Sequence, residues 1–272
     1  MQNNKRIIIM YDFDKTLSTN YMSEFKLIPD AGFKDAGEFW NYCDKQITHK
    51  YNMESNVAFL YATFEKAKEN NIRLNKKYLR SAGESVKFYP GVEEWFKRIN
   101  AYGRSKGLQV EHYIISSGIK DVILGTKIAS DIDNVFASDF AFDSNGEAFW
   151  PSVIVNYTTK TQYIFRIRKN STFSVHEDVT VNAKITDNTL VVPWTNMIYL
   201  GDGFTDIPSM EIIKNKGGSS ICVYEKSHKD VADKIISDER VNYIAPTDYR
   251  DGEKIDRIVK NIIDGIANRV DR

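Results

Sequence analysis

Short apolar runs alternate with amphipathic stretches along most of the chain. Five runs are predicted to be buried strands, because they are short, rich in β-branched or aromatic residues and bounded by polar residues. They span residues 6–11, 111–115, 196–200, 220–224 and 241–245. Helical patterns lie at 91–102, 120–130, 204–215, 229–237 and 253–270. This alternation predicts a doubly wound, Rossmann-like α/β fold with a mostly parallel sheet and helices on both faces.

Residues 21–87 do not follow the alternation. They contain no strong strand run, but helical stretches at 38–51 and 55–70 that are rich in Tyr, Phe, Lys and Glu. Pro90-Gly91 marks the return to the alternating pattern. We therefore predict a helical cap domain at 21–87, inserted into an α/β core made of 1–20 and 88–272 and packed over the carboxyl edge of the sheet.

Two further segments interrupt the pattern. Residues 136–142 and 148–155 flank Asp143-Ser-Asn-Gly146, which predicts a β-hairpin because Asn-Gly favours a tight turn. Residues 171–195 are polar and are interpreted as an elaborated loop.

Composition narrows the class of protein. Lys and Arg equal Asp and Glu at 37 each, so no net charge favours nucleic acid or an anionic membrane. Cys43 and Cys222 are far apart and form no CxxC pattern, which argues against a disulfide framework or a zinc site. The apolar run 7–10 is too short for a signal peptide or a membrane span, so we expect a cytoplasmic enzyme with no membrane partner.

Polar residues follow three of the predicted strands. Asp12 and Asp14 follow the first strand, Ser116 follows the second, and Asp202 and Asp206 follow the third. The carboxyl ends of parallel strands meet at one edge of a sheet, where ligands bind. Each group alone has an ordinary explanation as a turn or a helix cap, but three together in this order predict one site.

The paired carboxylates indicate a metal. Asp12 and Asp14 are two residues apart on an extended segment, so their side chains point to the same side. Like charges this close call for a cation or a shared proton. Oxygen ligands with few neighbours suit Mg²⁺, which also takes phosphate oxygens. Asp202 is expected to ligate this ion, with Asp206 supporting it.

These groups predict phosphoryl transfer. Asp12 would attack phosphorus and form an aspartyl-phosphate, with the metal neutralising charge. Asp14 would protonate the leaving oxygen and then activate water. Ser116 and the backbone N–H groups around Ser117-Gly118 would hold the phosphoryl oxygens at a helix N-terminus.

A lysine is expected to pair with Asp12 and the phosphate. Lys160 is the first candidate, because it opens the amphipathic stretch 160–169, whose first turn would aim it into the site. Lys184 is the alternative, although it lies in a polar stretch with no clear helix. A solvent-exposed helix lysine is the ordinary reading of Lys160.

With these residues in view, the sequence resembles the haloacid dehalogenase superfamily, most closely its phosphoserine-phosphatase-like branch. The matching segments are Asp12-Phe-Asp-Lys-Thr-Leu17, Ile114-Ile-Ser-Ser-Gly118, Lys160 and Gly201-Asp-Gly-Phe-Thr-Asp-Ile-Pro-Ser-Met210. The resemblance implies Asp12 as nucleophile, Asp14 as acid and base, and Ser116 and Lys160 as phosphate ligands. It also implies that magnesium binds Asp12, Asp202 and the main-chain carbonyl of Asp14.

The resemblance leaves the substrate open beyond a small phosphorylated metabolite. Phosphoserine phosphatases of this branch hold the substrate amine with a cap glutamate. Tyr21 lies near that position and Glu24 is the nearest carboxylate, so both are candidate substrate-binding residues.

The residues bear differently on the alternative functions. Asp14 disfavours dehalogenation, because a halide leaving group needs no acid. A phosphomutase or phosphotransferase uses the same nucleophile, and the motifs do not separate it from a phosphatase. A non-catalytic phosphate-binding relative is the remaining alternative, and a receiver-like domain would have no use for Asp14 or a closing cap.

Overall fold

The computed structural model describes residues 3–171, 181–184 and 191–270. Within them, seven strands form one sheet in the order β4-β3-β2-β1-β5-β6-β7. The strands are β1 (Arg6–Tyr11), β2 (Gln109–Ile119), β3 (Asn134–Phe142), β4 (Ala148–Val153), β5 (Met197–Gly201), β6 (Ser219–Tyr224) and β7 (Tyr243–Pro246). All neighbours pair in parallel except β3 and β4, which are antiparallel. The predicted α/β fold class is confirmed.

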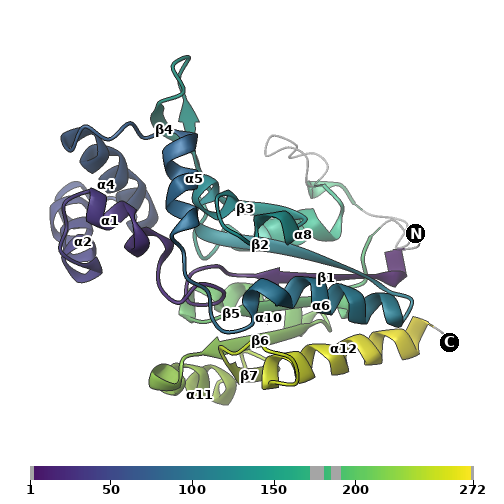
Figure 1. Cartoon of the computed structure of the whole chain (residues 1–272). Coiled ribbons are helices and arrows are strands. Elements are labelled where there is room, and N and C mark those ends of the chain that lie inside the picture. Colours follow the sequence, from purple (N-terminus) through teal and green to yellow (C-terminus); the bar gives the residue numbers. More distant parts are fainter. Residues whose placement is uncertain (1–2, 172–180, 185–190, 271–272) are drawn as a thin grey trace.

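Helices cover both faces of the sheet (Figure 1). On one face lie α6 (Val92–Ser105), α7 (Lys120–Leu124) and α12 (Lys254–Val270), and on the other α8 (Lys160–Arg168), α10 (Ile207–Asn215) and α11 (Lys229–Ser237). Alternate residues of β1 point to opposite faces of the sheet. Ile7 and Ile9 pack against the helices on the first face, and Ile8 and Met10 pack against those on the second. This division explains why the strand reads as a continuous apolar run.

The chain between β1 and α6 is helical. It contains α1 (Leu27–Asp30), α2 (Ala36–Tyr42), α3 (His49–Tyr51), α4 (Ser55–Glu69) and α5 (Lys76–Glu84). Figure 1 shows these helices gathered beyond the carboxyl ends of the strands. A Cβ added at Gly125 would lie 2.0 Å from the Arg80 carbonyl oxygen, so this glycine lets α5 pack directly on the chain after α7. Arg80 Nε also lies 3.0 Å from Asp121 Oδ1, which joins α5 to α7 itself.

Most predicted elements are present, with differences at their ends. The hairpin is confirmed, and Gly146 takes a positive φ of 75° at its turn. The predicted helix over 120–130 is wrong in length, because α7 ends at Leu124. The predicted helix over 38–51 changes type at Cys43–Thr48, which is a π-helical turn. Of the segment 171–195, residues 172–180 and 185–190 lie outside the described part. No helix among the described residues combines the length and the apolar character needed to cross a bilayer.

His112 is a neutral, fully buried histidine between the sheet and α6. Its Nδ1 lies 2.9 Å from the Tyr11 hydroxyl, and its Nε2 lies 3.1 Å from Asn100 Oδ1. Trp95 Nε1 donates a hydrogen bond of 2.8 Å to the same hydroxyl. Burial lowers the pKa of His112 from 6.5 to about 3. The His112 ring is therefore protonated far less readily in the folded state than in the unfolded chain.

This histidine should make the fold sensitive to acid. Between about pH 3 and 6.5 the unfolded state binds the proton and the folded state does not, so the His112 contribution to stability rises with pH and is complete above that range. At pH 5 the loss should be about 2 kcal/mol relative to pH 8. In urea unfolding experiments at both pH values, the free energy of unfolding should depend less on pH in His112→Gln than in the parent. His49→Gln, whose ring is 74% exposed, is the control; an unchanged dependence in His112→Gln would contradict the assignment.

Candidate active site

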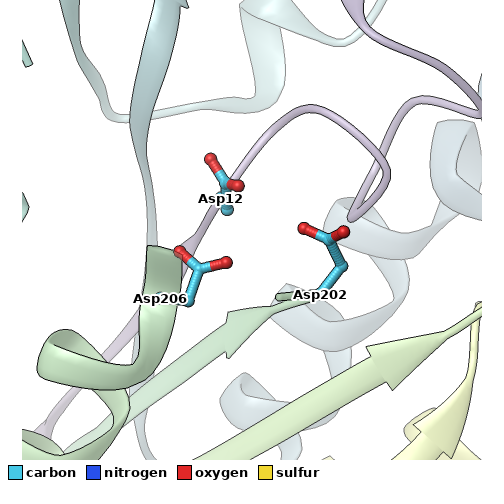
Figure 2. A group of neighbouring side chains, drawn as sticks. All are labelled: Asp12, Asp202 and Asp206. Atoms are coloured by element: carbon cyan, nitrogen blue, oxygen red, sulfur yellow. The ribbon is translucent and has the colours of Figure 1, made fainter. Parts of the chain in front are cut away.

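Three carboxylates meet at the carboxyl edge of the sheet. Asp12 follows β1. Its N–H donates a 2.9 Å hydrogen bond to the Leu200 carbonyl, which holds it against the neighbouring strand β5. Asp202 follows β5, and Asp206 precedes α10. One oxygen from each of Asp12, Asp202 and Asp206 lies within 4.8 Å of the others. Figure 2 shows the three carboxylates facing a common space.

Lys160 lies among these carboxylates. Its Nζ is 2.9 Å from Asp12 Oδ1 and 2.8 Å from Asp206 Oδ1, and the residue is only 1% exposed. Burial lowers the pKa of Lys160, but the charges of Asp12 and Asp206 raise it more, so the net pKa lies well above its ordinary value. The ammonium therefore stays charged and bridges the two acids. Lys184, the alternative lysine, is exposed.

The turn before α8 determines where Lys160 points. Asn156 Oδ1 accepts hydrogen bonds from the N–H groups of Thr158 and Thr159, at 3.1 and 2.9 Å. The Asn156 carbonyl accepts a 2.9 Å hydrogen bond from Lys160 N–H. Asn156 thus fixes the turn that leads into α8 and holds the backbone of the residue that carries the ammonium.

Tyr199 adds a hydrogen bond that the sequence analysis missed. Its hydroxyl donates to Asp206 Oδ1 at 2.7 Å, on the same oxygen that Lys160 contacts. Asp206 is fully buried, and its Oδ2 has no hydrogen-bond partner among the described residues. A buried carboxylate oxygen without a partner is costly. The only local signal was a Tyr inside a buried strand, which is typical of packing.

Asp14 points toward the helical segment. Its Oδ1 accepts a 2.7 Å hydrogen bond from Met22 N–H. Burial, followed by the charge of Asp12, raises the pKa of Asp14 to about 8. Asp14 therefore carries a proton at neutral pH in the absence of a metal. Burial and the charge of Asp206 likewise raise the pKa of Asp12, against the opposing effect of Lys160.

Ser116, Ser117 and Gly118 line the same cavity as the carboxylates. They lie within the last residues of β2 rather than after it, because the strand continues to Ile119 beyond a shift in its pairing with β3. Ser116 Oγ accepts a 3.0 Å hydrogen bond from Gly118 N–H. The helix that follows, α7, starts at Lys120.

The two candidate substrate-binding residues are placed differently. Tyr21 lines the cavity. Glu24 is not among the lining residues, and its carboxylate accepts hydrogen bonds from Asn20 Nδ2 at 2.9 Å and from Tyr21 N–H at 3.3 Å. Glu24 therefore supports the turn that presents Tyr21.

No protein-family model matches the chain. An uncharacterized protein of Borreliella burgdorferi is 28% identical over an alignment of 277 positions, and this alignment covers 92% of this chain and 93% of the relative.

Solved structures of similar fold share little sequence with the chain. A HAD family hydrolase from Salmonella enterica has a TM-score of 0.59 at 16% identity, over 94% of this chain and 70% of that one. A substrate-bound phosphoserine phosphatase has a TM-score of 0.55 at 17% identity, over 94% and 98%. A probable phosphoserine phosphatase from Vibrio cholerae has a TM-score of 0.56 at 14% identity, over 99% and 68%. The predicted resemblance therefore holds at the level of the fold, which this chain shares with HAD family hydrolases and phosphoserine phosphatases.

Proposed function

We propose that the chain is a magnesium-dependent phosphomonoester hydrolase that acts through an aspartyl-phosphate on Asp12. The observation that carries the proposal is the cluster of Asp12, Asp202 and Asp206 with the Lys160 ammonium between two of them. The solved phosphoserine phosphatases of the same fold support it, and one of them is described as a phospho-aspartyl intermediate analogue.

The donor set fits Mg²⁺. The three carboxylates carry a formal charge of −3 and Lys160 carries +1, which leaves −2 for a divalent cation to balance. All the donors are oxygens, as magnesium prefers. The unpartnered Asp206 Oδ2 shows that the cluster is not satisfied by protein groups within the described residues. Asp12 and Asp202 would hold the ion with the Asp14 carbonyl, and Asp206 would support it. Bound there, magnesium would neutralise charge on the phosphoryl oxygens.

The residues then divide the reaction into two displacements. A carboxylate oxygen of Asp12 attacks phosphorus, the bond from phosphorus to the ester oxygen breaks, and Asp14 gives its proton to the leaving oxygen. In the second step Asp14 takes a proton from water, which attacks phosphorus and releases inorganic phosphate from Asp12. Lys160 holds Asp12 in place and faces the phosphoryl charge. Ser116 and the N–H groups near Ser117 and Gly118 orient the phosphoryl oxygens.

Removal of magnesium tests the proposal. The purified chain should hydrolyse p-nitrophenyl phosphate with magnesium and lose at least about 100-fold in rate after chelation with EDTA, because the carboxylate cluster then repels the phosphoryl group. Magnesium added back should restore the rate. Calcium, which suits larger and more flexible oxygen shells, is the control cation. Full turnover in EDTA would contradict the metal requirement, and the absence of turnover by the loaded protein would favour a phosphate-binding role.

Asp14→Asn should separate the two steps. With p-nitrophenyl phosphate the leaving group needs no acid, so phosphorylation should proceed while hydrolysis of the acyl phosphate stalls. Mass spectrometry of the intact protein should then show one added phosphoryl group, and steady-state turnover should fall by about 10²- to 10⁴-fold. With an alkyl phosphate the variant should barely turn over. Turnover at the parent rate on both substrates would contradict the acid and base role.

A further inference from the structure

The cavity beside Asp12 is much larger than a phosphate. Its volume is about 530 Å³, within the range of pockets that hold small organic ligands. Residues of the α/β core line it on one side and residues of the helical segment line it on the other. The part not used by the carboxylate cluster is therefore available to the alcohol that the phosphate esterifies.

Five aromatic side chains line that part of the cavity, together with small polar residues such as Ser23, Thr48 and Ser55. The aromatic residues come from the helical segment and from the two core loops next to Lys160 and Asp202, and they are Tyr21, Trp40, Phe59, Tyr157 and Phe204. The Tyr21 and Trp40 ring centroids are 5.3 Å apart at an interplanar angle of 64°, and those of Trp40 and Phe59 are 5.5 Å apart at 36°. Buried Phe39 packs behind Trp40 at 5.1 Å. These three rings form a packed wall rather than a loose surface.

The rim of the cavity exposes two more rings. Tyr157 is 51% exposed and Phe204 is 55% exposed, although both line the cavity. Single exposed aromatic residues are common on protein surfaces, but two of them at the mouth of an aromatic cavity can cover a bound ring. Asn56 Nδ2 donates to the Val155 carbonyl at 3.1 Å, which joins α4 to the loop before Tyr157. The wall and the rim are thus held next to each other.

The charges of the lining disfavour a second anionic group. Among the described residues that line the cavity, the only cation is Lys160, and Asp12 and Asp206 already neutralise it. Of the lining residues that the helical segment supplies, only Asp44 is charged, and it is a carboxylate. A carboxylate or second phosphate on the leaving group would meet repulsion there and no free ammonium.

Lys15 is a further cation close to this cavity. It lines a neighbouring cavity of about 240 Å³, and its Nζ lies 4.0 Å from the centroid of the Tyr21 ring. The Lys15 ammonium is therefore engaged in a cation–π contact with Tyr21. A preference for acidic substrates over neutral ones would show that Lys15 turns toward the ester instead.

We infer that the natural substrates are phosphate monoesters of alcohols that carry an aromatic ring and no second anionic group. The inference rests on the proposed phosphatase function and adds the class of leaving group. The wall of Tyr21, Trp40 and Phe59 would stack on the ring, with Tyr157 and Phe204 closing over it. Phosphoserine, whose leaving group is a small amino acid with a carboxylate, lacks both features.

Four alkyl phosphates test the inference. They are 2-phenylethyl phosphate, n-propyl phosphate, phosphoserine and choline phosphate, assayed by release of inorganic phosphate with magnesium. Phenylethanol and propanol are primary alkanols of similar acidity, so their ratio reports binding of the ring rather than the ease of bond cleavage. We expect kcat/KM for the phenylethyl ester to exceed that for the propyl ester by about 30-fold, the order expected for burial of one phenyl ring. Phosphoserine should be no better than the propyl ester.

Two variants connect this preference to the cavity. Trp40→Leu and Tyr157→Ala should each lower the ratio of phenylethyl to propyl kcat/KM to a few-fold. Tyr157 is more than half exposed, so its truncation should leave the fold intact. The Tyr157 variant therefore still tests the preference if loss of Trp40 disturbs folding. Trp150→Ala is the matched control, because Trp150 is 67% exposed and does not line the cavity. Its kinetics should equal those of the parent.

The outcomes separate this inference from the proposed function. Equal kcat/KM for the phenylethyl and propyl esters, with both activities lost in Asp12→Asn, would overturn the aromatic class and leave the phosphatase intact. Higher kcat/KM for phosphoserine or for choline phosphate than for the phenylethyl ester would also overturn it, in favour of an anionic or a cationic leaving group. If none of the esters is hydrolysed, the proposed function fails and the inference falls with it.

Discussion

Asp12→Asn should reduce turnover of any phosphate monoester by roughly 10⁴-fold or more, because an amide cannot replace a carboxylate nucleophile. The substitution keeps the shape of the side chain. Lys160 retains its 2.8 Å contact with Asp206, and repulsion within the carboxylate cluster decreases. We therefore expect the variant to unfold, without magnesium, at a urea concentration equal to or above that of the parent. Loss of activity would then not be loss of fold.

The control for this variant is Asp143→Asn. Asp143 lies in the turn between β3 and β4, where its Oδ1 accepts hydrogen bonds from the N–H groups of Asn145 and Glu147. Asparagine can accept the same bonds, so turnover should stay within about twofold of the parent. Steady-state assays with p-nitrophenyl phosphate give both numbers. A rate for Asp12→Asn within about tenfold of the parent would rule out a covalent role for Asp12.

Lys160→Met should affect both stability and activity. Methionine fills a similar volume but removes the ammonium that lies 2.9 Å from Asp12 and 2.8 Å from Asp206. Two buried carboxylates are then left without a cation, which should cost about 3 kcal/mol in the absence of magnesium. kcat/KM should fall by about 10²- to 10³-fold, because the phosphoryl charge also loses this partner.

Urea unfolding of Lys160→Met with and without magnesium measures the first effect. The variant has more uncompensated negative charge, so saturating magnesium should recover a larger share of stability in the variant than in the parent. Lys229→Met is the control: Lys229 pairs with Asp233 on the surface of α11, and its loss should leave the urea midpoint close to that of the parent. Parent-like stability and kinetics in Lys160→Met would contradict the bridging role.

The sequence was informative where the physical cause of structure is local. A buried strand such as 6–11 is recognisable from its own residues, and the acids that follow it lie at the ligand-binding edge for topological reasons. The end of α7, by contrast, coincides with a contact to a residue far away in the sequence. Gly125 packs on the Arg80 backbone, and the helix ends at the residue before it. Periodicity within 120–130 contains no information about that contact.

The same distinction applies to the candidate site. Asp12, Asp202 and Asp206 could be placed together because each is near the end of a predicted strand. Tyr199 and Trp40 could not, because their roles arise from packing between elements: Tyr199 reaches Asp206 across the start of α10, and Trp40 reaches the cavity from α2. An aromatic residue within a strand or an amphipathic helix has the same local pattern when it only fills the core.

The covalent intermediate on Asp12 is the central claim, and acid quenching during turnover tests it most directly. The parent chain would be mixed with magnesium and excess phosphate ester, quenched in acid and digested, and its peptides analysed by mass spectrometry. We expect one phosphoryl group on Asp12 that hydroxylamine removes, as for an acyl phosphate. A phosphoryl group on another residue, or turnover with no phosphorylated peptide in either the parent or Asp14→Asn, would contradict the account.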